Sequence, residues 1–245
     1  PPFVEALQLN GSQYLLPYGI SLMTMVYNRD HFNEMGVQEP PLTWNSPEWT
    51  YDEFVEVAKK LTVGSGTDNI TRYGVSGIYW DSWITLPYPW GGRWVTDDLK
   101  TFLGTEPEPI AALQSIQDLI HVHRVMPNVY GGTGFVNQQG AMGGVGTWTL
   151  NSLAQRPEIN WSFMPWFRVK ETTQGAIFPI GYGILATSTK IDAAWELIKY
   201  LTWNEEANRE YAIAAGAIPS NLVNLAAWRE HWEDVFGFDI NTQVV

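Results

Sequence analysis

The sequence contains no cysteine, which excludes disulfide bonds, thiolate catalysis and cysteine-based zinc sites. It is also poor in basic residues, with 14 lysines and arginines against 26 acidic residues and a formal net charge of −12. Such a chain repels phosphate groups, so binding to nucleic acids or to anionic membrane surfaces is not expected. No apolar run reaches the roughly 18 residues that a membrane span requires.

Tryptophan is the residue that stands out among those present, with 13 in a chain of 245 residues. Apolar residues make up 45% of the chain, which is enough for a substantial core in one large domain or two modest ones. The indole rings suit two roles, because they can fill a core or offer flat platforms to a ligand such as a pyranose ring. Composition alone leaves both roles open.

Local patterns predict several helices. The pattern around Thr50 and Glu53 is that of a capping box, followed by an apolar stripe at helical spacing. Other helices are expected at 4–9, after a cap at Asn28 and before Gly36, from Pro109 with a stripe of Ile110, Leu113, Ile116 and Ile120, from about Asp192, and after a cap at Asn204.

Short apolar segments between these helices predict strands. They lie at 23–27, 74–79, 140–142, 161–164 and 182–187. Short strands that alternate with longer helices are typical of an α/β fold.

Several motifs, in this order and spacing, resemble extracellular solute-binding family 1 of ABC importers, which contains many sugar-binding proteins. The stretches that carry the resemblance span about residues 14–220: Leu16-Pro17-Tyr18-Gly19, Met25 to Phe32 with Gly36, Thr43-Trp44 with Trp49 to Phe54, Gly140-Ala141-Met142 with Gly146-Thr147-Trp148, Gly181 to Ile184, Ala193 to Thr202, and Gly216 to Pro219.

The resemblance implies a two-lobe α/β architecture of the periplasmic-binding-protein type II class, with a ligand held in the cleft between lobes that close by hinge motion. It assigns 1–18 to the end of the N-terminal lobe and a crossover, 19–182 to the C-terminal lobe, and 183–245 to a return crossover and helices on the N-terminal lobe. It implies an extracytoplasmic, monomeric protein, free or lipid-anchored, that delivers its ligand to the permease subunits of an ABC transporter. No catalysis, cofactor or metal is expected.

The family pattern extends beyond this sequence at both ends, and Pro1-Pro2-Phe3 lacks the features of a signal peptide. We therefore expect the sequence to be a fragment, with most of the C-terminal lobe and part of the N-terminal lobe. Apolar surface made to meet the rest of the N-terminal lobe should then be exposed.

The expected ligand is a sugar or oligosaccharide, bound by aromatic faces and by polar groups for its hydroxyls. The resemblance places Trp148 at a position where family members often stack a sugar, and places Gly181, Tyr182 and Tyr18 on the crossovers. The remaining candidates follow predicted strands or flank small residues: Trp80, Asp81, Trp83, Trp90, Gly91 and Gly92.

Other tryptophans are expected to pack in the ordinary way, because they lie on helix or strand patterns. These are Trp44, Trp49, Trp161, Trp166, Trp195, Trp203, Trp228 and Trp232.

A glycoside hydrolase is the main alternative, but it needs a carboxyl pair. The spacing of Asp81, Asp97, Asp98 and Glu106 singles out no such pair. His121 and His123 lie on different helix faces, which argues against a metal site. A glycerol-phosphate-like solute is a second ligand class, although it requires a basic pocket and Arg93 is the basic residue near the tryptophan cluster.

Overall fold

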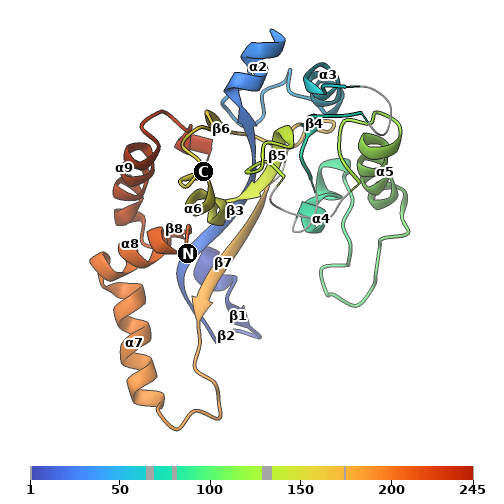
Figure 1. Ribbon diagram of the computed structural model, residues 1–245. Helices are drawn as coiled ribbons and strands as arrows, with labels where there is room; N and C mark the ends of the chain where they lie inside the picture. The colour runs from blue at the N-terminus through green and yellow to red at the C-terminus, as the bar shows by residue number, and fades with distance from the viewer. Residues whose placement is uncertain (1, 65–68, 79–81, 129–133, 174, 245) are drawn as a thin grey trace. The chain divides into compact units, whose positions relative to one another are not determined.

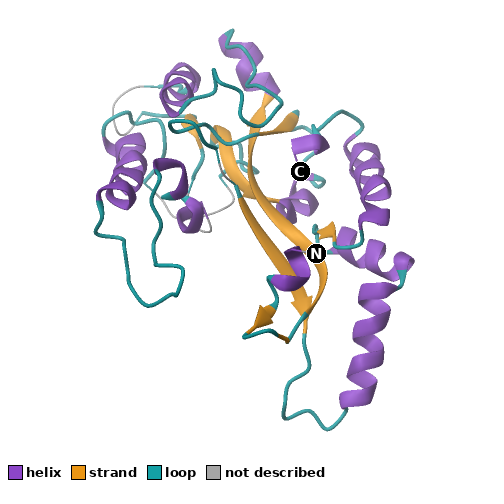
Figure 2. Cartoon of the chain, turned by 180° about the vertical axis from the view of Figure 1, so that it is seen from behind, coloured by secondary structure: helices purple, strands orange, loops and turns teal. Residues whose placement is uncertain are grey.

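The computed structural model describes residues 2–64, 69–78, 82–128, 134–173 and 175–244. Strands and helices alternate along the chain, which confirms the predicted α/β class (Figures 1 and 2). The chain divides into two compact units. Unit 1 comprises Pro1–Leu22, Gly146–Gln155 and Ile177–Asp239, and unit 2 comprises Met23–Val145, Arg156–Ala176 and Ile240–Val245.

Unit 2 is built on the strand order β4-β5-β3-β6. These strands are β3 (Leu16–Asn28), β4 (Tyr73–Val75), β5 (Gly140–Gly146) and β6 (Trp161–Met164). β4 pairs parallel to β5, whereas β6 pairs antiparallel to β3 with Met25 opposite Met164. The predicted strand 161–164 is confirmed, and 23–27 and 140–142 lie inside longer strands. Of the predicted strand 74–79, only the beginning is strand, and Tyr79 lies outside the described residues.

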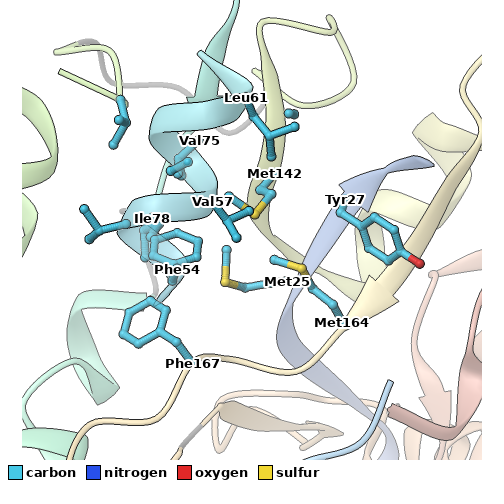
Figure 3. Close-up of a cluster of buried hydrophobic side chains, with 14 of the residues drawn as sticks. Met25, Tyr27, Phe54, Val57, Leu61, Val75, Ile78, Met142, Met164 and Phe167 are labelled. Atoms are coloured by element: carbon cyan, nitrogen blue, oxygen red, sulfur yellow. The ribbon is translucent and has the colours of Figure 1, made fainter. Parts of the chain in front are cut away.

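The core of unit 2 forms where helices cover this sheet. The helices are α2 (Arg29–Met35), α3 (Tyr51–Leu61), α4 (Ser82–Thr85), η1 (Tyr88–Trp90), α5 (Pro107–His121) and η4 (Thr242–Val244). Phe54, Val57 and Leu61 of α3 face Met25, Met142 and Met164 of the strands (Figure 3). The apolar stripe predicted after Thr50 is therefore buried, and Thr50 caps α3 by accepting a hydrogen bond from the Glu53 amide at 3.2 Å.

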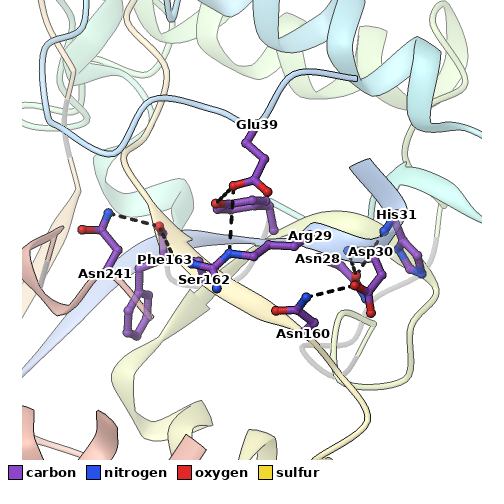
Figure 4. Close-up of polar contacts among 10 residues, drawn as sticks. Asn28, Arg29, Asp30, His31, Glu39, Asn160, Ser162, Phe163 and Asn241 are labelled. Atoms are coloured by element: carbon purple, nitrogen blue, oxygen red, sulfur yellow. Dashed lines mark hydrogen bonds and ion pairs between the residues drawn. The ribbon is translucent and has the colours of Figure 1, made fainter. Parts of the chain in front are cut away.

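Helix α2 begins and ends where its capping residues predict. The Asn28 side chain accepts hydrogen bonds from the backbone amides of Asp30 (3.0 Å) and His31 (3.2 Å), as Figure 4 shows. The helix ends at Gly36, whose φ of 63° is in the left-handed region that glycine tolerates. The side-chain amide of Asn160 donates a hydrogen bond to the Asp30 carboxylate at 2.9 Å and so connects this helix to the residue before β6.

The stripe predicted for α5 is buried only in part. Ile116 and Ile120 pack against the core as predicted, whereas Ile110 and Leu113 are about half exposed. Ala112, Ser115 and Leu119 are buried beside them. Ser115 can be buried because its hydroxyl donates to the Ala112 carbonyl.

Unit 1 contains the first part of β3, which pairs with β7 (Ala176–Tyr182) and β8 (Ile218–Pro219). In the β8 pairing, Gly19 lies opposite Pro219. The helices of this unit are α1 (Pro2–Glu5), η2 (Thr147–Thr149), α6 (Leu150–Leu153), α7 (Ile191–Trp203), α8 (Glu205–Ala214), η3 (Leu222–Asn224) and α9 (Leu225–Phe236). Helices α7 and α8 begin near the predicted residues, and the Asn204 side chain caps α8.

Two local predictions in unit 1 are wrong. The helix expected at 4–9 is only α1, because Asn10 and Gly11 adopt positive φ and form a two-residue hairpin turn between β1 (Gln8–Leu9) and β2 (Ser12–Gln13). The second wrong prediction is the strand at 182–187. The observed strand is β7, which ends at Tyr182, so the residues after Tyr182 are not strand. Pro179 lies within β7, which a strand at the margin of a sheet tolerates.

Tryptophan burial separates the two expected roles. Trp49, Trp161, Trp166, Trp228 and Trp232 are buried as predicted, and Trp44 is partly buried against the core of unit 2.

On α7 the packing prediction is wrong, because Trp195 and Trp203 are 39% and 61% exposed. Leu197 and Tyr200 of the same helix are also exposed, so the expected apolar surface is present.

None of the described helices is both long and apolar enough to cross a bilayer.

Candidate ligand-binding site

Trp148 lies just beyond the end of β5, in η2 of unit 1. Its side chain is partly open to solvent, with 38% of the residue surface exposed. The indole folds back over Gly146, where a Cβ atom would come within 2.2 Å of the ring. The ring centroid lies 6.4 Å from that of Phe178 on β7, with an interplanar angle of 55°. The strand end thus presents an exposed indole supported by a second aromatic ring.

Three tyrosines form a cluster in the same unit, hereafter the tyrosine cluster: Tyr18 of β3, Tyr182 of β7 and Tyr211 of α8. Tyr18 and Tyr182 stack with ring centroids 4.8 Å apart, and Tyr211 meets the Tyr18 ring edge-on, also at 4.8 Å. The family resemblance placed Tyr18 and Tyr182 on the two crossovers, and the pairing of β3 with β7 brings the two residues together. Tyr211 was missed because its pattern indicated only a helix stripe.

The hydroxyl groups of Tyr18 and Tyr182 stay protonated over the physiological range because their pKa values are raised. Burial raises the pKa of Tyr18, and the neighbouring Tyr211 hydroxyl adds to the shift. Burial likewise raises the pKa of Tyr182, with a further contribution from its hydrogen bond to Tyr211. A protonated phenol can both donate and accept a hydrogen bond, as recognition of a hydroxylated ligand requires.

Gly181, the neighbouring candidate, has a structural reason to be glycine. A Cβ atom there would lie 2.8 Å from the carbonyl oxygen of Leu16, so the close approach of β7 to β3 requires the small residue. A contact between Gly181 and a ligand stays a prediction.

Trp90, Gly91 and Gly92 lie in unit 2. The Trp90 ring is partly buried and meets Tyr51 edge-on at 5.8 Å, beside the core. Gly91 ends η1 with a φ of 88°, and a Cβ atom on Gly92 would lie 2.7 Å from the Pro109 ring. These contacts account for the residue types locally, and a ligand-binding role for the three residues stays a prediction.

The other unit 2 candidates are placed less fully. Trp80 and Asp81 lie outside the described residues, and Trp83 is described only as part of α4. The structure therefore places Trp148, Gly181, Tyr182 and Tyr18 in unit 1, where the rings of Tyr18 and Tyr182 are in contact, and places Trp90, Gly91 and Gly92 in unit 2.

Of the carboxyl groups suggested for hydrolysis, Asp81 lies outside the described residues, whereas Asp97 and Asp98 are each engaged by neighbouring groups. Asp97 is ion-paired with Arg93. Hydrogen bonds from Thr96 and from the Lys100 amide lower the pKa of Asp98, whereas a general acid needs a raised pKa. Within the described residues, no group of three or more histidine, aspartate or glutamate side chains is arranged to hold a metal ion.

The fold matches solved solute-binding proteins. The ABC substrate-binding protein Lmo0181 from Listeria monocytogenes, in complex with cycloalternan, superposes with a TM-score of 0.79 at 23% identity, covering 96% of this chain and 62% of that one. The maltose/maltodextrin-binding domain MalE from Bdellovibrio bacteriovorus, bound to maltotriose, gives 0.75 at 20% identity, covering 100% and 66%.

UgpB from Mycobacterium tuberculosis, in complex with glycerophosphocholine, gives a TM-score of 0.77 at 19% identity, covering 95% of this chain and 58% of that one. The chain thus spans less than two thirds of each of these proteins, and at these identities the likeness shows the shared type II fold. The model of the family described as bacterial extracellular solute-binding protein matches residues 1–233. The chain belongs to that family.

Proposed function

We propose that this chain is part of the substrate-binding component of an ABC importer and that its ligand is a neutral sugar or oligosaccharide. One observation carries the proposal: a single compact unit of a solute-binding protein contains both a partly exposed indole and the tyrosine cluster. Aromatic faces suit the apolar C–H faces of sugars, and phenolic hydroxyls suit their hydroxyl groups. The similar proteins bound to cycloalternan and maltotriose support this ligand class.

A glycerophosphocholine-like solute is the second candidate, since UgpB has the same fold. Its phosphate would need free basic groups. Acidic side chains outnumber basic ones in unit 1, where Lys199 is paired with Glu196 at 2.6 Å and Arg209 with Glu210 at 3.1 Å. In unit 2, Arg93 is paired with Asp97. These three basic groups are thus already paired, which favours a neutral ligand over a phosphate at their positions.

We further propose that unit 1 belongs to the N-terminal lobe and unit 2 to the C-terminal lobe of a type II binding protein. The chain passes from one unit to the other within β3, at the end of β5, between Gln155 and Arg156, at the start of β7, and between Asp239 and Ile240. Such crossing segments suit a hinge, because a few residues can absorb the rotation that closes the lobes over a ligand. These unit boundaries differ from the predicted 1–18, 19–182 and 183–245, and both divisions remain open to test.

The exposed apolar surface of unit 1 fits this assignment. Helix α7 exposes apolar side chains on more than one face, and such helices are normally buried. Beside it, a hollow of about 370 Å³ is lined chiefly by aromatic and aliphatic side chains: Tyr14, Leu15, Tyr182, Ile184, Trp195 and Ile198. We propose that further parts of the N-terminal lobe cover the exposed apolar side chains of α7 in the full-length protein. We also propose that this protein acts outside the cytoplasm and docks on permease subunits.

The test is a titration of the chain and of a full-length parent with maltose, maltotriose, longer maltodextrins and glycerophosphocholine. Tryptophan fluorescence reports binding, and chromatography of the same samples reports cleavage. We expect a saturable signal with a saccharide and no cleavage products. Cleavage would favour a hydrolase, a response to glycerophosphocholine alone would favour the second ligand class, and a full-length parent that binds no saccharide would contradict the proposal.

A further inference from the structure

The backbone of Tyr18 is held in place by side chains that do not belong to the tyrosine cluster. The Tyr18 carbonyl oxygen accepts hydrogen bonds from the Asn208 side-chain amide at 2.8 Å and from the Ser220 backbone amide at 3.2 Å. The preceding carbonyl, of Pro17, accepts from the Ser220 hydroxyl at 2.9 Å. Two consecutive carbonyls at the start of β3 are therefore bonded to α8 and to the residue after β8.

Asn208 is fully buried, and both its side-chain nitrogen and its side-chain oxygen have hydrogen-bond partners. Besides Tyr18, its amide nitrogen contacts the Leu201 carbonyl at 3.4 Å, and its oxygen accepts from the Asn224 amide at 3.3 Å. A buried amide with this degree of satisfaction has one defined orientation, because rotating it would leave several groups unpaired.

Asn208 and Tyr211 lie three residues apart on α8, so they share one face of the helix. This face of α8 therefore contacts Tyr18 at two points. The Asn208 amide bonds to the Tyr18 backbone carbonyl, and the Tyr211 ring packs against the Tyr18 ring. This double contact fixes where the Tyr18 ring can lie relative to Tyr182.

We propose that Asn208 is a positioning residue for the tyrosine cluster: its amide holds the Tyr18 backbone so that the Tyr18 ring stays stacked on Tyr182. The inference rests on the proposed function only for its consequence, which is that loosening the cluster weakens saccharide binding. The positioning itself can be measured without any ligand.

The first measurement is NMR of the chain with tyrosine labelled with ¹³C at Cζ. The chain has 11 tyrosines, and the signals of Tyr18 and Tyr182 are assigned by their loss in Tyr18→Phe and Tyr182→Phe. In Asn208→Leu, which keeps the side-chain size but removes the amide, both signals should move towards that of the exposed Tyr14. Unchanged signals in a folded Asn208→Leu chain would overturn the proposal.

Ser220→Ala serves as a second variant if Asn208→Leu does not fold. It removes only the hydroxyl bond to Pro17, so we expect a smaller shift of the Tyr18 signal in the same direction, and no shift would count against the proposal. Thr202→Val is the control, because its buried hydroxyl bonds to the Ile198 carbonyl within α7. It should lower stability slightly and leave both tyrosine signals in place.

The second measurement is maltotriose affinity by calorimetry on the same variants, under conditions where each is folded. We expect Asn208→Leu to bind roughly tenfold more weakly, equivalent to about 1.4 kcal/mol, and Thr202→Val to stay within roughly twofold of the unsubstituted chain. If the unsubstituted chain and its full-length parent bind no saccharide, the proposed function fails and the NMR result alone decides the role of Asn208. Shifted signals with unchanged affinity would refute the link to binding.

Discussion

At the scale of single residues, the candidate site depends on rings that are neither buried nor fully exposed. Trp148 keeps 38% of its surface open while Phe178 supports it, and Tyr182 is similarly partly exposed beside the buried Tyr18. A partly exposed ring can contact a ligand. Because its neighbours already restrict its conformations, it loses less conformational entropy when the ligand binds.

Trp148→Ala should therefore reduce saccharide affinity. Loss of a stacking ring is expected to weaken binding by roughly tenfold or more, with little change in the free energy of unfolding because the ring is partly exposed. Calorimetric titration with maltotriose measures the affinity, and urea unfolding measures the stability. Trp203→Ala is the matched control, since it removes another exposed indole of unit 1 that lies outside the candidate site. Equal effects of the two substitutions would argue against a special role for Trp148.

A second residue-scale prediction concerns alkaline pH. Burial and the hydrogen bond from its hydroxyl to Glu39, at 2.7 Å, raise the pKa of Tyr27 to about 12. Below about pH 10 the Tyr27 phenol is neutral in both the folded and the unfolded chain, so its full contribution to the free energy of unfolding is present. As the pH rises from about 10 towards 12, the unfolded chain releases the proton first, and the free energy of unfolding falls.

Tyr27→Phe should make the fall of the unfolding free energy with pH shallower. A smaller fall should remain, because the pKa values of Tyr51, Tyr18 and Tyr182 are also raised. Urea unfolding at several pH values between about 9 and 11 measures it. Tyr14→Phe, at a tyrosine that is 63% exposed, provides the comparison. Identical slopes for Tyr27→Phe and the unsubstituted chain would show that Tyr27 ionises normally in the folded state.

At the scale of elements, the ends of helices follow from local chemistry. Asn28→Ala should destabilise the chain by about 1 kcal/mol, because the amides of Asp30 and His31 lose their acceptor at the start of α2. Asn28→Asp keeps an acceptor at the same position and should retain most of the stability. The midpoints of urea unfolding compare the three proteins, and a loss as large in Asn28→Asp as in Asn28→Ala would mean that capping is not the cause.

Helix faces are less predictable than helix ends. The stripe of α3 is buried as its spacing predicts, whereas α5 buries Ser115 and exposes Ile110. The stripe of α3 meets the core along its whole length, whereas that of α5 meets it at Ile116 and Ile120 but not at Ile110. A sequence pattern records hydrophobicity but not how far a neighbouring core extends along a helix.

At the scale of the whole molecule, the exposed apolar surface around α7 predicts self-association. Exposed apolar patches of this kind promote contacts between chains when nothing covers them. The chain should therefore bind an apolar fluorescent dye and form oligomers at high concentration in light-scattering measurements. Substituting Leu197, Tyr200 and Trp203 together by serine should lower both signals.

The matched comparison replaces Leu99 and Phe102 of unit 2 by serine, since these residues are 75% and 64% exposed but lie on a separate loop. If that pair of substitutions lowers self-association as much as the α7 set does, the α7 surface is not the main contact.

The α/β class, the positions of most helices and the family could be predicted from the residues alone, because capping residues, periodic apolar positions and ordered motifs are legible along the chain. The sequence also predicted that Tyr18 and Tyr182 belong to related crossovers. The stacking of their rings, the contact with Tyr211 and the hydrogen bond from Asn208 to the Tyr18 backbone follow only from the three-dimensional fold. Asn208 and Tyr18 are 190 positions apart, and no local pattern encodes which distant side chain completes a cluster or a hydrogen bond.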